Sequence, residues 1–212
     1  MIPESVYLSY LDNLLEGNKS ECAKIITDLL EQGVNLKDIY ISLIQRSMYW
    51  IGSMWENDRS SIAAEHVATK ITESMLTLMY PQIMKTPRNG KSVIITCVDK
   101  EFHEIGPRII ADFFELKGWN ARFYGANMPQ NEVIKEIGLK QPDVVGISIN
   151  FYINVIRLLK LIEEIKRHHP DQKIIVGGQA LSGDHSEVLS KYKNVFHVSS
   201  IDALEEYIEN FD

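Results

Sequence analysis

The sequence has few cysteines, few positive charges relative to negative ones, and no long apolar run, and each shortage excludes a class of protein. Only two of its 212 residues are cysteines, Cys22 and Cys97, so a disulfide-stabilised scaffold is excluded. We expect both thiols to be reduced core residues. Lysine and arginine total 22 against 29 aspartates and glutamates, for a formal net charge of -7 at pH 7. A basic surface for direct nucleic-acid binding is therefore not expected.

The sequence also lacks a membrane segment. No apolar stretch approaches the roughly 20 residues that a transmembrane helix needs, and residues 1–11 have the pattern of an amphipathic helix rather than of a signal peptide. The composition is otherwise that of a globular protein, with 45% hydrophobic and 24% charged residues. We expect a cytoplasmic chain that does not bind a membrane.

The period of the hydrophobic pattern divides the chain. Over residues 1–80, apolar side chains recur three and four positions apart in four segments, which predicts an antiparallel four-helix bundle. The fourth helix is expected to stop before Pro81. Residues 81–90 contain two prolines and one glycine and have little periodicity, so they are interpreted as a linker.

Residues 91–212 alternate short β-rich runs with helical patterns. Five such units imply a parallel sheet with helices on both faces. We predict a flavodoxin-like, doubly wound, five-stranded parallel sheet with strand order 2-1-3-4-5. Ligands of such sheets bind beyond the carboxyl ends of the strands, at the point where the strand order reverses.

Three predicted strand ends carry residues suited to binding a ligand. In chain order these are Glu101, His103 and Gly106, then Ser148, then Gly177 and Gly178. An imidazole can ligate a metal through one nitrogen while the other donates to a carboxylate, and Glu101 is placed to accept from His103. One histidine is too few for a protein-only zinc site, so the other ligands would come with a cofactor. Each element alone has a simpler interpretation, a surface ion pair for the histidine and a turn for the glycines.

Together these residues resemble the motif of the cobalamin-binding domain of the methionine synthase type. That family has Asp-x-His-x-x-Gly, Ser-x-Leu and Gly-Gly after the corresponding strands, and a helical bundle that caps the upper face of the corrin. This chain has Glu101-Phe-His103-Glu-Ile-Gly106, Ser148-Ile-Asn150 and Gly177-Gly178. The resemblance covers nearly the whole chain, with residues 1–80 as the bundle and 91–212 as the cobalamin-binding domain.

The resemblance implies a role for each motif residue. His103 would displace the cofactor's own dimethylbenzimidazole and bind cobalt, with Glu101 supporting it. Ser148 would hydrogen-bond the displaced nucleotide tail, and the glycine pair would let that tail thread into the sheet domain. Two positions depart from the family pattern: Glu101 replaces aspartate with a longer arm, and Asn150 replaces leucine, which puts the packing of the tail in doubt.

A second pattern lies in the helical half. Trp55, Glu65 and His66 resemble the Trp-x9-Glu-His motif of light-sensing, adenosylcobalamin-dependent regulators of the CarH type. The resemblance implies that Trp55 packs against the adenosyl group and that Glu65 binds its polar edge. In isolation the same pattern is more often a core tryptophan and a solvated Glu–His pair. Glu56 occupies the position where those regulators have a second cobalt-binding histidine, and His66 is the nearest substitute by sequence.

We therefore expect a cobalamin-binding protein, most simply a stand-alone adenosylcobalamin-dependent light sensor rather than an enzyme. Its signal would pass through a homo-oligomer or a partner signalling protein. Two alternatives share the fold and His103. One is a corrinoid protein that carries a methyl group between methyltransferases, with methylcobalamin as cofactor, and the other is a cobalamin storage or delivery module. Phe151 and Tyr152, which follow Ser148, are expected either to line the channel of the nucleotide tail or to belong to the core, and the core is the preferred interpretation.

Overall fold

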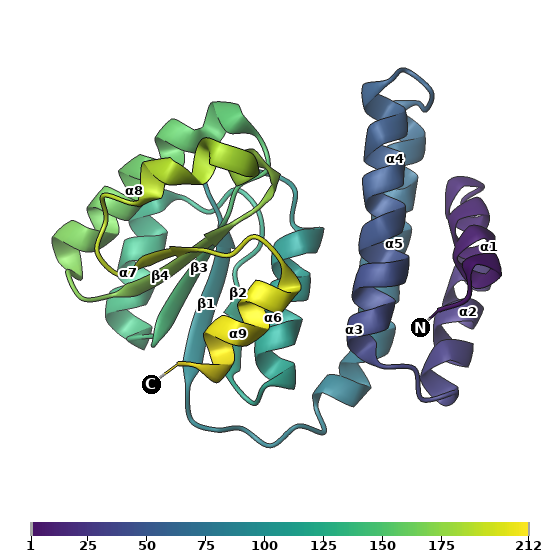
Figure 1. Ribbon diagram of the computed structural model, residues 1–212, viewed down its shortest axis with the longest axis horizontal. Helices are drawn as coiled ribbons and strands as arrows, with labels where there is room; N and C mark the ends of the chain where they lie inside the picture. Colours follow the sequence, from purple (N-terminus) through teal and green to yellow (C-terminus); the bar gives the residue numbers. More distant parts are fainter. Residues whose placement is uncertain (1, 212) are drawn as a thin grey trace. The chain divides into compact units, whose positions relative to one another are not determined.

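The computed structural model describes residues 2–211, without the side chains of residues 183–185 (Figure 1). Contacts divide the chain into two compact units, Met1–Ile83 and Met84–Asp212. The first unit is entirely helical, as predicted. Its elements are α1 (Glu4–Leu15), α2 (Lys19–Glu31), α3 (Leu36–Asp38), η1 (Ile39–Gln45), α4 (Arg46–Glu56) and α5 (Ile62–Ile83).

The segments α3, η1 and α4 form one continuous helix, but its middle part is a π-helix. In a π-helix each N–H bonds five residues back rather than four, so every turn takes up more residues. Four of the seven residues of η1 are fully buried: Ile39, Tyr40, Leu43 and Ile44. The spacing of apolar residues predicts the helix here but does not distinguish its π segment.

The expectation that the fourth helix stops before Pro81 is wrong, because α5 continues through Pro81 to Ile83. A proline costs most in a helix interior, where it removes a hydrogen bond and crowds the preceding turn. Pro81 lies in the last turn, and the burial of Met79 and Ile83 on either side of it favours continuing the helix. The helix begins after Ser61, whose Oγ accepts a hydrogen bond from the N–H of Ala64 at 3.1 Å.

The second unit is a five-stranded parallel sheet with the order β2-β1-β3-β4-β5, which confirms the predicted topology. In Figure 1, α6 and α9 lie on one side of the sheet, and α7 and α8 lie on the other. The strands are β1 (Ser92–Cys97), β2 (Asn120–Phe123), β3 (Val144–Ser148), β4 (Lys173–Gly177) and β5 (Val195–His197). The α-helices are α6 (Ile105–Leu116), α7 (Gln130–Lys140), α8 (Val155–His168) and α9 (Ile201–Glu209), and the short helices are η2 (Tyr152–Asn154), η3 (Gln179–Leu181) and η4 (Gly183–Leu189).

The segment before β1 is tied to the sheet unit and is not a loose connection. The guanidinium of Arg88 donates to the backbone oxygens of Glu115 and Trp119, each at 3.1 Å. Gly118, in the turn between α6 and β2, has φ +83°, and a Cβ there would lie 2.8 Å from the carbonyl oxygen of Pro87. This close backbone contact needs glycine and fixes the approach of the chain to β1.

Both cysteines are free and buried, as predicted. Burial raises the pKa of the Cys22 thiol to about 11 and that of the Cys97 thiol to about 12, so both stay protonated at neutral pH. Among the helices of residues 2–211, none has the length and apolar content needed to cross a membrane.

Candidate functional site

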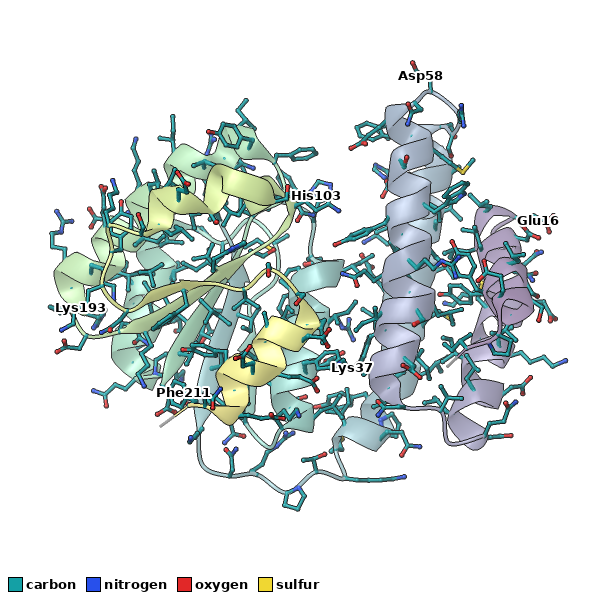
Figure 2. The ribbon with its side chains drawn as sticks, in the orientation of Figure 1. Glu16, Lys37, Asp58, His103, Lys193 and Phe211 are labelled. Atoms are coloured by element: carbon teal, nitrogen blue, oxygen red, sulfur yellow. The ribbon has the colours of Figure 1, made fainter. Side chains whose placement is uncertain are left out.

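The motif residues of the sheet unit meet at one edge. Cys97 at the end of β1 pairs with Ser148 at the end of β3, and Ser148 pairs with Gly177 at the end of β4. The loops that follow these strands are therefore neighbours, as the predicted topology requires. Figure 2 shows His103 at this carboxyl edge of the sheet.

The carboxylate of Glu101 is the centre of the site. Its Oε1 accepts hydrogen bonds from the backbone N–H of His103 at 3.2 Å and from the Nδ1 of the same residue at 2.6 Å. Its Oε2 accepts from the backbone N–H groups of Asn150 at 2.9 Å and Phe151 at 3.2 Å, and from the side-chain Nδ2 of Asn154 at 3.3 Å. One buried side chain, 0% exposed, thus joins the loop after β1 to the loop after β3.

These donors determine the charge of Glu101. Burial alone raises the pKa of a carboxyl group, but the hydrogen bonds from His103, Asn150 and Phe151 outweigh it and lower the pKa of Glu101 to about 2. An ionised carboxylate can only accept, so Nδ1 of His103 carries the proton of their shared bond. In the neutral imidazole the lone pair is then on Nε2, which is the nitrogen that would bind a metal.

The ring of His103 has a second contact. It packs edge-on against the ring of Phe151, with centroids 4.7 Å apart and planes at 81°. The side chain of His103 remains 46% exposed. Phe151 and Tyr152 were expected in the core, and this expectation is wrong: they are 46% and 58% exposed. The loop after β3 turns outward at Asn150, and so both aromatic side chains lie at the rim of the site.

Several large apolar residues close to His103 or Phe151 in sequence are exposed. In addition to Phe151 and Tyr152, the large apolar residues left exposed on these two loops and the start of α8 are Phe102, Ile153 and Ile156, at 64%, 79% and 67%. Contiguous exposed apolar surface marks a binding site more often than it marks a bare surface. A half-exposed histidine beside such a surface suits a large, flat and largely apolar group that carries a metal.

Gly106, expected with Glu101 and His103 after the first strand, is the second residue of α6. Glu104, the residue before Ile105, already has helical backbone angles. A Cβ at Gly106 would meet no atom within 4 Å. The protein's own packing therefore does not require glycine here, and the space is open to a ligand.

The glycine pair after β4 has the opposite property. Gly178 has φ +111°, and a Cβ there would lie 2.1 Å from the carbonyl oxygen of Ile149, while one at Gly177 would lie 3.0 Å from that of Val198. Contacts within the protein thus account for glycine at both positions without a bound tail. Asn150 strengthens the same junction, since its Oδ1 accepts from the backbone N–H of Gln179 at 3.3 Å. Ser148, 9% exposed, ends β3 beneath these loops.

The residues of the second pattern lie in the helical unit. Trp55, in the last turn of α4, is 40% exposed and is not a core residue. Glu65, in the first turn of α5, has partners for both carboxylate oxygens: Nδ1 of His66 at 2.6 Å from Oε2, and Oγ1 of Thr69 at 2.7 Å from Oε1. His66 is exposed, with 70% of its side chain accessible.

Sequence reasoning missed Asn154, although it contacts the central carboxylate. It is 3% exposed, a low value for an asparagine. Its position at the end of a short 3₁₀ turn, η2, brings its side chain under the loop after β1, where Nδ2 also donates to the carbonyl oxygen of Lys100 at 3.3 Å. A polar residue before a helix looks like an ordinary cap in sequence, so no signal distinguished it.

Among the described side chains, those of residues 2–182 and 186–211, no group of three or more histidine, cysteine, aspartate or glutamate residues is arranged to hold a metal ion. The orientation of the ring by Glu101, the open space at Gly106 and the apolar rim all fit a corrinoid. Fold and site together define a cofactor-binding α/β protein with His103 at the switch point of the sheet.

Two family models match this chain and indicate which class of cofactor it binds. A model described as the B12 binding domain matches residues 91–208, and a second model with the same description matches residues 8–79. The chain belongs to the B12 binding domain family. The predicted cobalamin-binding domain is thereby confirmed.

Individual relatives are distant. Trimethylamine corrinoid protein 1 of Methanosarcina acetivorans is 18% identical over 191 residues, covering 87% of this chain and 88% of the relative. The transcriptional repressor CarA of Myxococcus xanthus is 24% identical over 120 residues, covering 57% of this chain and 41% of the repressor. Among solved structures, the monomethylamine corrinoid protein of Methanosarcina barkeri has a TM-score of 0.84 at 14% identity, over 97% of this chain and 98% of that one.

Proposed function

We propose that the protein is a corrinoid methyl carrier, with His103 as the protein ligand of cobalt. The observation that carries this proposal is the Glu101–His103 pair, which holds the imidazole in the tautomer that leaves its lone pair on Nε2. A corrinoid bound there would accept a methyl group from one partner protein and pass it to another.

The residues of the chain have separate roles in this proposal. Glu101 keeps the ring of His103 oriented and increases the basicity of its nitrogen. Phe102 and Phe151 would cover apolar surface of a bound corrinoid and so keep water away from His103. Gly106 leaves room for a group that lies close to the backbone at the start of α6.

Two observations favour a methyl carrier over the light sensor expected from the helical half. Glu65 makes a hydrogen bond through each oxygen within α5, to His66 and Thr69, so the hydroxyls of an adenosyl group would have to share or displace these local partners. The relative named as a trimethylamine corrinoid protein also matches over nearly its full length, whereas the match to the repressor covers 41% of it.

The adenosylcobalamin sensor is retained as the second candidate because of Trp55. An aromatic side chain that is 40% exposed on a helical unit suits a wall for an adenosyl group. The two functions make opposite predictions about which upper ligand the protein prefers and about the effect of light.

The first test measures retention of the cofactor. The whole protein is mixed in the dark with methylcobalamin or adenosylcobalamin, freed of unbound cofactor by gel filtration, and its absorption is recorded before and after green light. His103→Ala and Trp55→Ala are compared with His168→Ala. The last is a matched control, since His168 is also about half exposed (47%), and its Nδ1 also has a partner, the carbonyl oxygen of Glu164 at 2.9 Å.

The identity of the nitrogen on cobalt is read by electron paramagnetic resonance of the Co(II) form in protein labelled with [15N]histidine. A protein ligand splits the cobalt lines into doublets, whereas unlabelled dimethylbenzimidazole splits them into triplets. We expect doublets for the wild type and for His168→Ala, and their loss in His103→Ala. The bound corrinoid should also stay on the wild-type protein through repeated reduction and methylation by methyl iodide.

Other results would change the assignment. Tighter retention of adenosylcobalamin, lost in Trp55→Ala, with a change of elution volume on illumination, would establish the sensor instead. Release of the corrinoid during the first cycle of methylation would favour storage or delivery. If no corrinoid is retained by the wild type, the proposed function is wrong.

A further inference from the structure

A cavity lies in the sheet unit between α7 and α8, which cover the same side of the sheet (Figure 1). Its volume is about 440 Å³, and pockets of roughly 300–1,000 Å³ are the ones that hold small molecules. Its walls come from the loop after β1, the end of the loop after β2, the start of α7 and the first two turns of α8. Neither Glu101 nor His103 lines it, so this α7–α8 cavity is separate from the site described above.

The outer part of the α7–α8 cavity is positively charged. Arg157 and Lys160 lie one turn apart on α8, and both residues are exposed. One carboxylate lines the cavity with them, that of Asp99, which lies 3.9 Å from Nε of Arg157. Within the described side chains of residues 2–182 and 186–211, no hydrogen bond or ion pair involves Lys160. Two cations against one carboxylate leave a positive excess, on a chain whose formal net charge is -7.

The inner part of the α7–α8 cavity is apolar. Leu161 is 2% exposed and belongs to the hydrophobic core of the sheet unit, and Met128 packs against that core from the loop after β2. A ligand that filled the cavity would therefore bury apolar surface at one end and place charge at the other.

The start of α7 adds to the positive potential. Gln130 and Asn131, the first two residues of this 11-residue helix, line the cavity. They follow Pro129, whose side chain provides no hydrogen-bonded cap for the helix. The first N–H groups of a helix have no partner within the helix and favour a negative charge nearby. The helix end therefore attracts an anion together with Lys160.

We propose that the α7–α8 cavity binds a small organic anion, in which a carboxylate or phosphate is attached to an apolar group. Lys160 and the N–H groups at the start of α7 would contact the charged group, and Met128 and Leu161 would cover the apolar part. The inference goes beyond the proposed function and does not depend on it, because the cavity shares no residue with the Glu101–His103 pair.

The first test titrates small anions into the whole protein without corrinoid. Of the seven methionines, Met128 lines the cavity, so the signal of its 13C-labelled methyl group, assigned with Met128→Leu, reports binding there. Phenyl phosphate and phenylacetate represent the two sources of the negative charge. Inorganic phosphate and benzyl alcohol represent the charged group and the apolar group alone. We expect a saturable shift of the Met128 signal, with a dissociation constant about tenfold lower for a phenyl anion than for inorganic phosphate or benzyl alcohol.

Two variants separate the cavity from the general charge of α8. Lys160→Glu and Arg167→Glu change the charge by the same amount at exposed positions of one helix. Arg167 pairs with Glu164, does not line the cavity and lies about 10 Å further along the helix by the rise per residue. We expect Lys160→Glu to raise the dissociation constant of the phenyl anion about tenfold, and Arg167→Glu to change it by less than about twofold.

Three results would overturn the inference: no shift of the Met128 signal with either phenyl anion at about 10 mM, equal affinity for a phenyl anion and inorganic phosphate, or equal effects of the two substitutions. Tighter binding of phenyl phosphate would identify a site for organic phosphates, and tighter binding of phenylacetate a site for organic carboxylates. Retention of a corrinoid by the wild type is measured separately. Its failure would remove the proposed function and leave the result of the Met128 titration unchanged.

Discussion

Among the described residues, two Glu–His pairs have the same Nδ1–carboxylate distance and different surroundings. Nδ1 of His103 lies 2.6 Å from Glu101, and Nδ1 of His66 lies 2.6 Å from Glu65. Glu101 is 0% exposed and accepts hydrogen bonds from two loops that are 50 residues apart in sequence. Glu65 is 25% exposed on its side chain, and its partners are its sequence neighbour and Thr69, one turn away on the same helix.

The difference shows that the contact distance of an ion pair does not measure what the pair does. The pair in α5 could break without disturbing any other element, because each contact is local to one helix. The carboxylate of the pair at the sheet edge joins the loops after β1 and β3, and its loss leaves the buried amide of Asn154 and two part-buried N–H groups without this acceptor. Only the Glu101–His103 pair can hold a metal ligand in one orientation.

The largest expected effect is that of Glu101→Ala. It removes the acceptor of the part-buried N–H groups of Asn150 and Phe151 and of the buried amide of Asn154, and each unsatisfied buried donor costs about 1–3 kcal/mol. We expect the sheet unit to lose about 4 kcal/mol of unfolding free energy, measured by urea unfolding with the fluorescence of the buried Trp119. Glu65→Ala is the matched control and should change stability by no more than about 0.5 kcal/mol. Equal losses of unfolding free energy in the two variants would contradict the conclusion that Glu101 joins two elements while Glu65 makes only local contacts.

The same contrast predicts a pH dependence. Burial raises the pKa of Glu101, but hydrogen bonds from His103 and the loop after β3 outweigh it and lower the pKa from 4.5 to about 2. Because the folded-state pKa is depressed, the stability that this carboxylate contributes is fully present above pH 4.5 and is lost as the pH falls through about 2. This amounts to about 3 kcal/mol. Glu101→Gln should lose this dependence, as read from urea midpoints of the cofactor-free protein between roughly pH 5 and pH 2, an interval that spans the two pKa values. An unchanged slope in the variant would show that another group is responsible.

The glycines of the site should respond in two ways. In Gly178→Ala the new Cβ would lie 2.1 Å from the carbonyl oxygen of Ile149, at a φ of +111° that alanine rarely adopts. We expect a loss of about 3 kcal/mol in unfolding free energy.

Gly106→Ala has open space around the new methyl group, and alanine favours a helix, so stability should not fall. If Gly106 leaves room for a corrinoid, methylcobalamin retention should drop in Gly106→Ala although the protein remains folded. Unchanged retention would contradict that role.

Much of the fold could be predicted from sequence because the relevant signals are periodic. The change from a helical period to alternating strands and helices predicts the two halves, and five βα units predict the sheet order. Local exceptions escape such signals. The π segment Ile39–Gln45 has the same composition as a helix, and Pro81 is tolerated because it is in the last turn of α5.

The site could be predicted in part for the same reason. Glu101 and His103 are two residues apart, so their contact is a local property of one loop. Asn154 reaches the same carboxylate from 53 positions later, and only the folded sheet brings it there. Phe151 was assigned to the core because it is aromatic and follows a buried strand, but the loop turns its side chain toward the rim. Contacts of this kind depend on the path of a loop, which composition does not encode.

The smallest expected effect is that of Trp55→Ala, which tests whether the helical unit that carries the Glu65–His66 pair also binds the cofactor. Because Trp55 is 40% exposed, truncation should lower stability by about 1 kcal/mol or less. A methyl carrier needs no aromatic wall for an adenosyl group, so retention of methylcobalamin should stay within about twofold, on the order of 0.4 kcal/mol. A selective loss of adenosylcobalamin in this variant, with methylcobalamin retained, would mean that the helical unit does recognise an upper ligand. The weakly held Glu65 pair would then be open to exchange its local partners for that ligand, and the tightly held Glu101 pair would serve only to fix the metal.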